Sequence, residues 1–142
     1  TFKTAKGKRA KRKTKKEMET LVYETLDNVG LRKAIDLLPS ELSGGMKKRI
    51  GLARTLILKP EIILYDEPTT GLDPITSKEI SNLIIEIQKK YNATSIIITH
   101  DISCVRLTGN IIHVLKDGKL YKSGRFNELK KSDDPWIYDF FN

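Results

Sequence analysis

The sequence predicts an α/β fold in which parallel strands are flanked by helices and followed by a C-terminal hairpin. Two short runs rich in β-branched residues, 62–66 and 94–99, are separated by a segment with helical periodicity, the alternation typical of a parallel sheet. In addition, Asp117-Gly118 is a favoured two-residue turn between the strand-like segments 111–116 and 119–122. The 142 residues are enough for one domain with a modest core.

The first expected helix begins near residue 17 and ends at Gly30. The next ten residues, 31–40, form a second short helix or a loop. A longer helix follows over about 44–58 and is stopped by Lys59-Pro60. Its apolar face consists of Met46, Ile50, Ala53 and Ile57. The basic side chains outside that face are expected to be solvated: Lys47, Lys48, Arg49 and Arg54.

The strand expected at 62–66 is nearly all apolar, as in a parallel strand buried on both faces. A helix over 73–92 follows, with Asp73 suited to the N-cap and Pro74 to the first helical position. The C-terminal segment after the hairpin contains several aromatic residues. Two short helices are expected there, over residues 127–131 and 136–141.

The positive charge of the chain is concentrated at its N-terminus. Residues 1–16 contain nine Lys and Arg and no acid, whereas residues 17–142 contain 17 basic and 18 acidic residues. We expect residues 1–16 to form a basic, disordered tail. Because no aromatic platform accompanies the charge, a solvated or foreign tail is favoured over an arm for nucleic acid or anionic lipid.

Composition also limits the cellular setting. Cys104 is the only cysteine, so no internal disulfide can form and a reducing compartment is allowed. No apolar run approaches the roughly 20 residues needed to span a bilayer. The basic N-terminus lacks the apolar core that follows the basic region of a signal peptide.

A glycine-rich turn is the first candidate functional feature. Gly44 and Gly45 lack a Cβ, so their backbone can approach a bulky anion, and the helix that starts there directs free N–H groups toward it. Ser43 can cap this helix or donate its hydroxyl to a phosphate oxygen. These three residues therefore predict a phosphate-binding turn.

The ends of the two strands supply the second candidate feature. Asp66 and Glu67 end the first strand, and His100 follows the second, where ligand sites gather in open α/β sheets. Asp66 suits a magnesium-bound water, and Glu67 suits polarising an attacking water. His113 lies inside an expected strand and is interpreted as structural. The residues thus predict a phosphate-handling surface with a metal and a base.

These motifs resemble the C-terminal part of an ABC-transporter ATP-binding subunit, over roughly residues 17–142. The correspondences are the signature (Leu42, Ser43, Gly44, Gly45, with Met46 where Gln is usual), the Walker B strand (62–67), the D-loop (Gly71, Leu72, Asp73) and the switch histidine, His100. Within the family, residues 39–46, 73–76 and 133–135 are most similar to the ATPase of Mla/Mce-type phospholipid transporters.

The resemblance implies a partial P-loop NTPase fold that lacks the Walker A half. Gly7-Lys8-Arg9 does not match the P-loop, because Arg9 stands where a magnesium-binding hydroxyl belongs. Residues 17–58 would form the helical subdomain and signature helix, and residues 59–142 the Walker B, D-loop, switch and C-terminal elements. ATP and Mg²⁺ are the implied ligands, with Glu67 and His100 catalytic, Asp66 holding Mg²⁺ through water, and Ser43, Gly44, Gly45 and Asp73 binding nucleotide.

The implied partners are a second ATPase subunit in a nucleotide-sandwich dimer and a transmembrane permease, at the inner face of the cell membrane. No specific nucleic acid is expected. Because the chain lacks the main nucleotide cradle, we expect it to be a truncated subunit that is inactive alone. Two alternatives are a non-catalytic interaction remnant and a nucleic-acid-associated ABC ATPase head. The helical pattern near Leu21 and the spacing in 39–46 favour the transporter.

Overall fold

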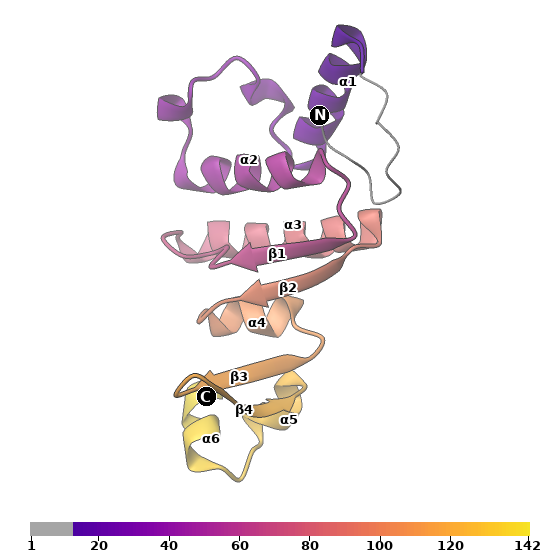
Figure 1. The fold of residues 1–142 in the computed structure, drawn as a ribbon. Coiled ribbons are helices and arrows are strands. Elements are labelled where there is room, and N and C mark those ends of the chain that lie inside the picture. Colours follow the sequence, from indigo (N-terminus) through magenta and orange to yellow (C-terminus); the bar gives the residue numbers. More distant parts are fainter. Residues whose placement is uncertain (1–12) are drawn as a thin grey trace.

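The computed structural model describes residues 13–142, in which helices and strands alternate along an elongated molecule (Figure 1). The helices α1 and α2 lie at one end, followed by the parallel pair β1–β2 with α3 behind it. Helix α4 comes next, and the hairpin β3–β4 lies at the other end with α5 and α6. The α/β fold class with a C-terminal hairpin is therefore confirmed.

The bounds of the helices follow polar capping residues. Thr14 caps α1 (Lys15–Asn28), Ser43 caps α2 (Gly44–Leu56), Asp73 caps α3 (Pro74–Tyr91) and Asp101 caps α4 (Ile102–Thr108). Each cap side chain accepts hydrogen bonds from N–H groups that the first helical turn leaves free. The caps predicted at Ser43 and Asp73 are thus confirmed, and Asn92 ends α3 in a left-handed conformation.

Between α1 and α2 the chain forms two short 3₁₀ turns rather than a continuous helix, η1 (Arg32–Ala34) and η2 (Pro39–Glu41). Of the expected basic tail, residues 1–12 lie outside the described residues. The tail boundary at residue 16 differs from the structure, because Lys15 and Lys16 already belong to α1. The capping box between Thr14 and Glu17 explains this early start.

The strands β1 (Ile62–Asp66) and β2 (Thr94–Ile98) pair in parallel, with Ile62 opposite Thr94 and Asp66 opposite Ile98. The prediction that β1 is buried on both faces is wrong. Ile63 and Tyr65 face the core, whereas the other face of the pair is exposed. We call this exposed surface the bare face, and its apolar residues are Ile62, Leu64, Ile96 and Ile98.

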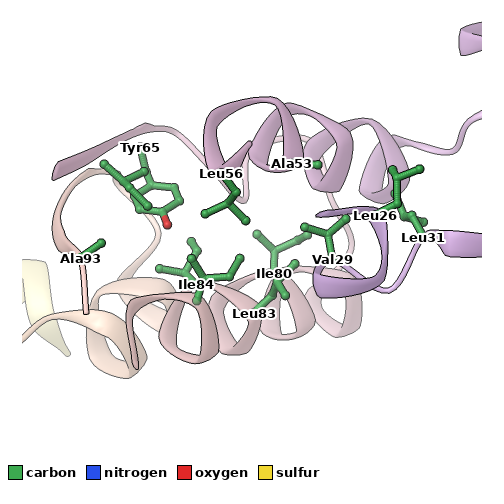
Figure 2. Packing of buried hydrophobic residues seen from close by; sticks show 12 residues of the cluster. Leu26, Val29, Leu31, Ala53, Leu56, Tyr65, Ile80, Leu83, Ile84 and Ala93 are labelled. Carbon is green, nitrogen blue, oxygen red and sulfur yellow. The ribbon is translucent and has the colours of Figure 1, made fainter. Parts of the chain in front are cut away.

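Two separate clusters of buried side chains stabilise the chain. In the larger one, side chains of α3 meet those of α2, β1 and the end of α1, as Figure 2 shows for Leu56, Ile80 and Ile84. The smaller cluster joins the hairpin to the two terminal helices through Val114, Leu129, Ile137 and Phe141. Helix α3 therefore positions the sheet on which the candidate site lies.

The C-terminal elements are β3 (Ile112–Lys116), β4 (Lys119–Gly124), α5 (Phe126–Lys130) and α6 (Pro135–Phe141). The antiparallel hairpin turns at Asp117 and Gly118, both with positive φ, as the turn requires. His113 is bonded to Ser123 across the hairpin, in agreement with a structural role. Within residues 13–142, no helix combines the length and the apolar character that crossing a membrane requires.

Candidate functional site

Glu67 lies in the turn that follows β1, and its backbone adopts an unusual conformation. Its φ of +45° is in the left-handed region, which a residue with a Cβ adopts only when its surroundings hold it there. The Glu67 N–H donates to the carbonyl of Ile98 at 2.9 Å, and the Lys48 Nζ donates to the Glu67 carbonyl at 2.8 Å. Contacts from β2 and α2 therefore fix this turn on both sides of Glu67.

The carboxylate of Glu67 is held by three side chains. Its Oε1 lies 2.8 Å from Nδ1 of His100, and its Oε2 accepts from Oγ1 of Thr70 at 2.8 Å and more weakly from Oγ1 of Thr99 at 3.4 Å. The register of β1 and β2 explains why Glu67 and His100 lie close together, because Asp66 and Ile98 are paired at the ends of these parallel strands. The structure therefore joins Glu67 and His100, the two predicted catalytic residues.

The two groups of this pair change each other's proton affinity. The hydrogen bond with His100 lowers the pKa of Glu67 below its ordinary value of 4.5, and the bond from Thr70 lowers it further. The hydrogen bond and negative charge of Glu67 raise the pKa of His100 above 6.5, and the charge of Asp101 adds to this. The Glu67 contribution to stability is lost as pH falls through its lowered pKa, and the His100 contribution is lost as pH rises through its raised pKa. The pair therefore stabilises the fold fully between about pH 4.5 and 6.5.

Replacing Glu67 by glutamine is expected to lower the pKa of His100 toward 6.5. The amide keeps the size of the side chain but removes the negative charge that favours the imidazolium. A pH titration of the imidazole resonances by NMR measures this change. The resonances of His113, whose ring is hydrogen-bonded to Ser123 on the hairpin, provide an internal reference in the same spectra. An unchanged pKa of His100 would show that the pair does not form in solution.

The glycine-rich turn packs against the start of α3. Ser43 accepts from the N–H of Met46 at 3.2 Å, and a Cβ on Gly45 would lie only 2.7 Å from Cγ2 of Thr76. Asp73 accepts from the N–H groups of Ile75 and Thr76, both at 3.0 Å, and the bond from the Thr76 hydroxyl lowers its pKa. The turn of residues 43–45, named the signature turn below, thus lies next to the cap of α3.

Comparison with known proteins agrees with these features. The family model described as "ABC transporter" matches residues 2–70. The probable ribonucleotide transport ATP-binding protein mkl of Mycobacterium leprae is 40% identical over 131 residues, which are 92% of this chain and 38% of that protein. The chain is therefore similar to ABC transporter ATP-binding proteins over most of its length. Two further relatives are the intermembrane phospholipid transport system ATP-binding proteins MlaF of Haemophilus influenzae and Escherichia coli K12, 40% and 37% identical over 84% and 88% of this chain.

Solved structures of the ABC family share the fold. The cbiO1 protein of Clostridium perfringens, part of an ABC transporter complex, is 36% identical with a TM-score of 0.75, over 80% of this chain and 45% of that one. A dimeric ATP-binding cassette, MJ0796, bound to ADP and Pi, is 31% identical with a TM-score of 0.71, over 82% of this chain and 50% of that one. The chain spans about 38–46% of the length of the curated relatives named above.

Asp66, the predicted magnesium residue, is exposed at the end of β1. Among residues 13–142, no group of three or more His, Cys, Asp or Glu side chains could hold a metal ion. A single exposed carboxylate nevertheless fits Mg²⁺, because this ion keeps several waters and takes other ligands from substrate phosphates. Asp66 could therefore contribute one ligand, directly or through water, alongside a nucleotide.

Sequence reasoning missed several contacts around Glu67. The expectation that Lys48 and Arg49 are solvated is wrong, since Lys48 reaches Glu67 and Arg49 bonds both the Val29 carbonyl and Glu79. Leu52, one helical turn after Lys48, packs against the larger cluster. An apolar residue at this spacing indicates that the side of α2 that carries Lys48 is partly buried. The hydrogen bond from Thr70 to Glu67 was not predicted from the sequence, because it depends on the geometry of the turn, which brings the Thr70 hydroxyl to the Glu67 carboxylate.

Proposed function

We propose that this chain is the catalytic-glutamate and signature part of the ATP-binding subunit of a phospholipid transporter. The observation that carries the proposal is the Glu67–His100 pair at the ends of two parallel strands, on a chain that also has a capped signature turn. The phospholipid cargo rests on the printed names of the MlaF relatives. The subunit would lie at the cytoplasmic face of the membrane, bound to a permease.

In this proposal Glu67 is the general base for ATP hydrolysis. It orients the attacking water and takes its proton as the water oxygen bonds to the γ-phosphorus and ADP leaves. Its lowered pKa keeps the carboxylate ionised at neutral pH, so it can accept a hydrogen bond from the attacking water. His100 would donate to the γ-phosphate, and Asp66 would hold Mg²⁺ through water. When bound, Mg²⁺ would neutralise negative charge on the phosphates.

The signature turn would act on a different nucleotide, held mainly by a second ATPase subunit. Ser43 offers a hydroxyl, while Gly44 and Gly45 offer backbone N–H groups at the start of α2, where the helix dipole favours an anion. Asp73, in the adjacent D-loop, would face the same dimer interface. The dimeric structure of the similar cassette MJ0796 supports this arrangement.

The P-loop would come from a complementary half of the domain. No residue in the described part of the chain forms the backbone cradle and lysine that hold the β- and γ-phosphates. The bare face exposes Leu64 at 73% and Ile98 at 59%, and each strand of the β1–β2 pair has a neighbour on one side only. Unpaired strand edges and an apolar sheet face are what an additional part of a sheet would cover. We therefore propose that residues 17–142 form the C-terminal portion of the domain.

The chain alone is expected to show no ATPase activity, and activity is expected after addition of a polypeptide that carries the P-loop half of an MlaF relative. Release of inorganic phosphate measures the ATPase activity with and without the added polypeptide. Turnover by the isolated chain that is lost in Glu67→Gln would contradict the proposed division of the site. Failure of every P-loop half to restore turnover, despite binding, would instead favour a non-catalytic interaction module.

A further inference from the structure

Lys48 connects the signature helix to the turn that holds Glu67. It lies about one helical turn after Gly44, where α2 begins, and its side chain is half-buried. Its Nζ donates to the backbone carbonyl of Glu67 at 2.8 Å, across 19 positions of sequence. The neighbouring Lys47 is exposed and has no such bond within residues 13–142. The two lysines thus differ in environment although they are adjacent in sequence.

The conformation of Glu67 gives this contact a specific consequence. A left-handed backbone at a residue with a Cβ persists only where neighbouring groups over-determine it. The Glu67 carbonyl accepts from Lys48 and, more weakly at 3.4 Å, from the N–H of Thr70 in the same turn. Within the described part of the chain, Lys48 therefore provides the contact that ties this carbonyl to another element of secondary structure.

A shorter or uncharged side chain would not replace this contact. Lys48 lines a cavity of about 170 Å³ together with Leu52, Tyr65 and Asp66, so water can reach the carbonyl when the ammonium is removed. Water satisfies a carbonyl as a hydrogen-bond donor, but it does not fix the carbonyl relative to α2. Loss of Lys48 therefore releases the turn without leaving an unsatisfied buried group.

We propose that Lys48 is a positioning residue that holds the Glu67 turn in its left-handed conformation and so orients the carboxylate toward His100 and Thr70. The inference rests on the proposed function, because it gives Lys48 a part in hydrolysis only if Glu67 is the base. The signature turn begins the same helix, so Lys48 also links the surface proposed to meet the partner subunit's nucleotide with the base of its own subunit.

NMR of the full chain without nucleotide tests the positioning itself. In Lys48→Met, which keeps the unbranched side chain up to the ε position but removes the ammonium group, the ¹³Cα and ¹³Cβ shifts of Glu67 are expected to lose their left-handed character. Lys48→Arg is expected to retain them, and Lys47→Met is the matched control, in which they should not change. Glu67 shifts that stay unchanged in Lys48→Met, with the fold intact by amide spectra, would overturn the inference.

The pKa of His100 gives a second readout, in which positioning and simple charge effects have opposite signs. His100 faces the carboxylates of Glu67 and Asp101. Removing the cation at Lys48 would by charge alone favour the imidazolium and raise this pKa. Loosening the Glu67 contact is expected to lower it, by less than in Glu67→Gln. A rise in Lys48→Met would therefore contradict positioning.

Kinetics of the reconstituted ATPase test whether positioning matters for the reaction. Lys48→Met is expected to lower kcat by about tenfold with the KM for ATP unchanged, and Lys48→Arg to restore most of kcat. Altered Glu67 shifts without a change in kcat would overturn the role in hydrolysis. If no P-loop half gives turnover, the proposed function fails, whereas the NMR measurements still decide whether Lys48 holds the turn.

Discussion

Glu67→Gln is expected to lower kcat of the reconstituted ATPase by at least about a hundredfold while ATP still binds. Glutamine has nearly the same size, but its amide does not accept the proton of the attacking water. The change leaves the signature turn, Asp66 and the α3 cap intact, so nucleotide affinity is expected to stay within about twofold. Single-turnover hydrolysis and equilibrium binding of a fluorescent ATP analogue measure the two quantities.

Glu86→Gln provides the matched control for this prediction. Glu86 is an exposed carboxylate on α3 that makes no hydrogen bond or ion pair with any residue of 13–142, so its replacement removes the same charge without touching the site. Its kcat should equal that of the unchanged chain. If Glu67→Gln hydrolyses ATP as fast as Glu86→Gln, Glu67 is not the base.

Ile84→Ala is expected to reduce the free energy of unfolding by about 3–4 kcal/mol. Ile84 is 1% exposed and lies in the larger cluster, where α3 meets α2 and β1 (Figure 2). Truncation removes apolar surface and leaves a cavity, because the side chains of α2 and β1 around this position relax only in part. Urea denaturation followed by circular dichroism measures the loss.

Ile75→Ala is the matched control for Ile84→Ala, since it makes the same change on the same helix. Ile75 is 74% exposed, so its replacement is expected to change stability by less than about 0.5 kcal/mol. Equal destabilisation by the two substitutions would mean that α3 does not pack in solution as described.

The elements that could be predicted from the sequence were those with local signals. Polar caps such as Ser43 and Asp73 specify where helices begin, and the Asp117-Gly118 turn specifies the hairpin. Burial of β1 was predicted wrongly because an apolar run alone does not say how many of its faces are covered. That depends on which other elements pack against the sheet, and it is not a local property of residues 62–66.

The candidate site was predictable to the extent that topology determines it. The carboxyl ends of adjacent parallel strands lie at the same edge of a sheet, so the proximity of Glu67 and His100 follows from strand order. The bonds from Lys48 and Thr70 depend instead on the left-handed turn at Glu67 and on the angle at which α2 crosses the sheet. Neither quantity can be read from residue spacing.

The exposed strand pair also affects the fate of the polypeptide before assembly. The bare face exposes the apolar side chains of Ile62, Leu64, Ile96 and Ile98. It lies beside unpaired strand edges, to which strands of other copies of the chain can add. A freshly synthesised copy without its complement should therefore be a target for molecular chaperones and should precipitate as its concentration rises. In the proposed function, the complementary half of the domain would cover these residues and remove this hazard.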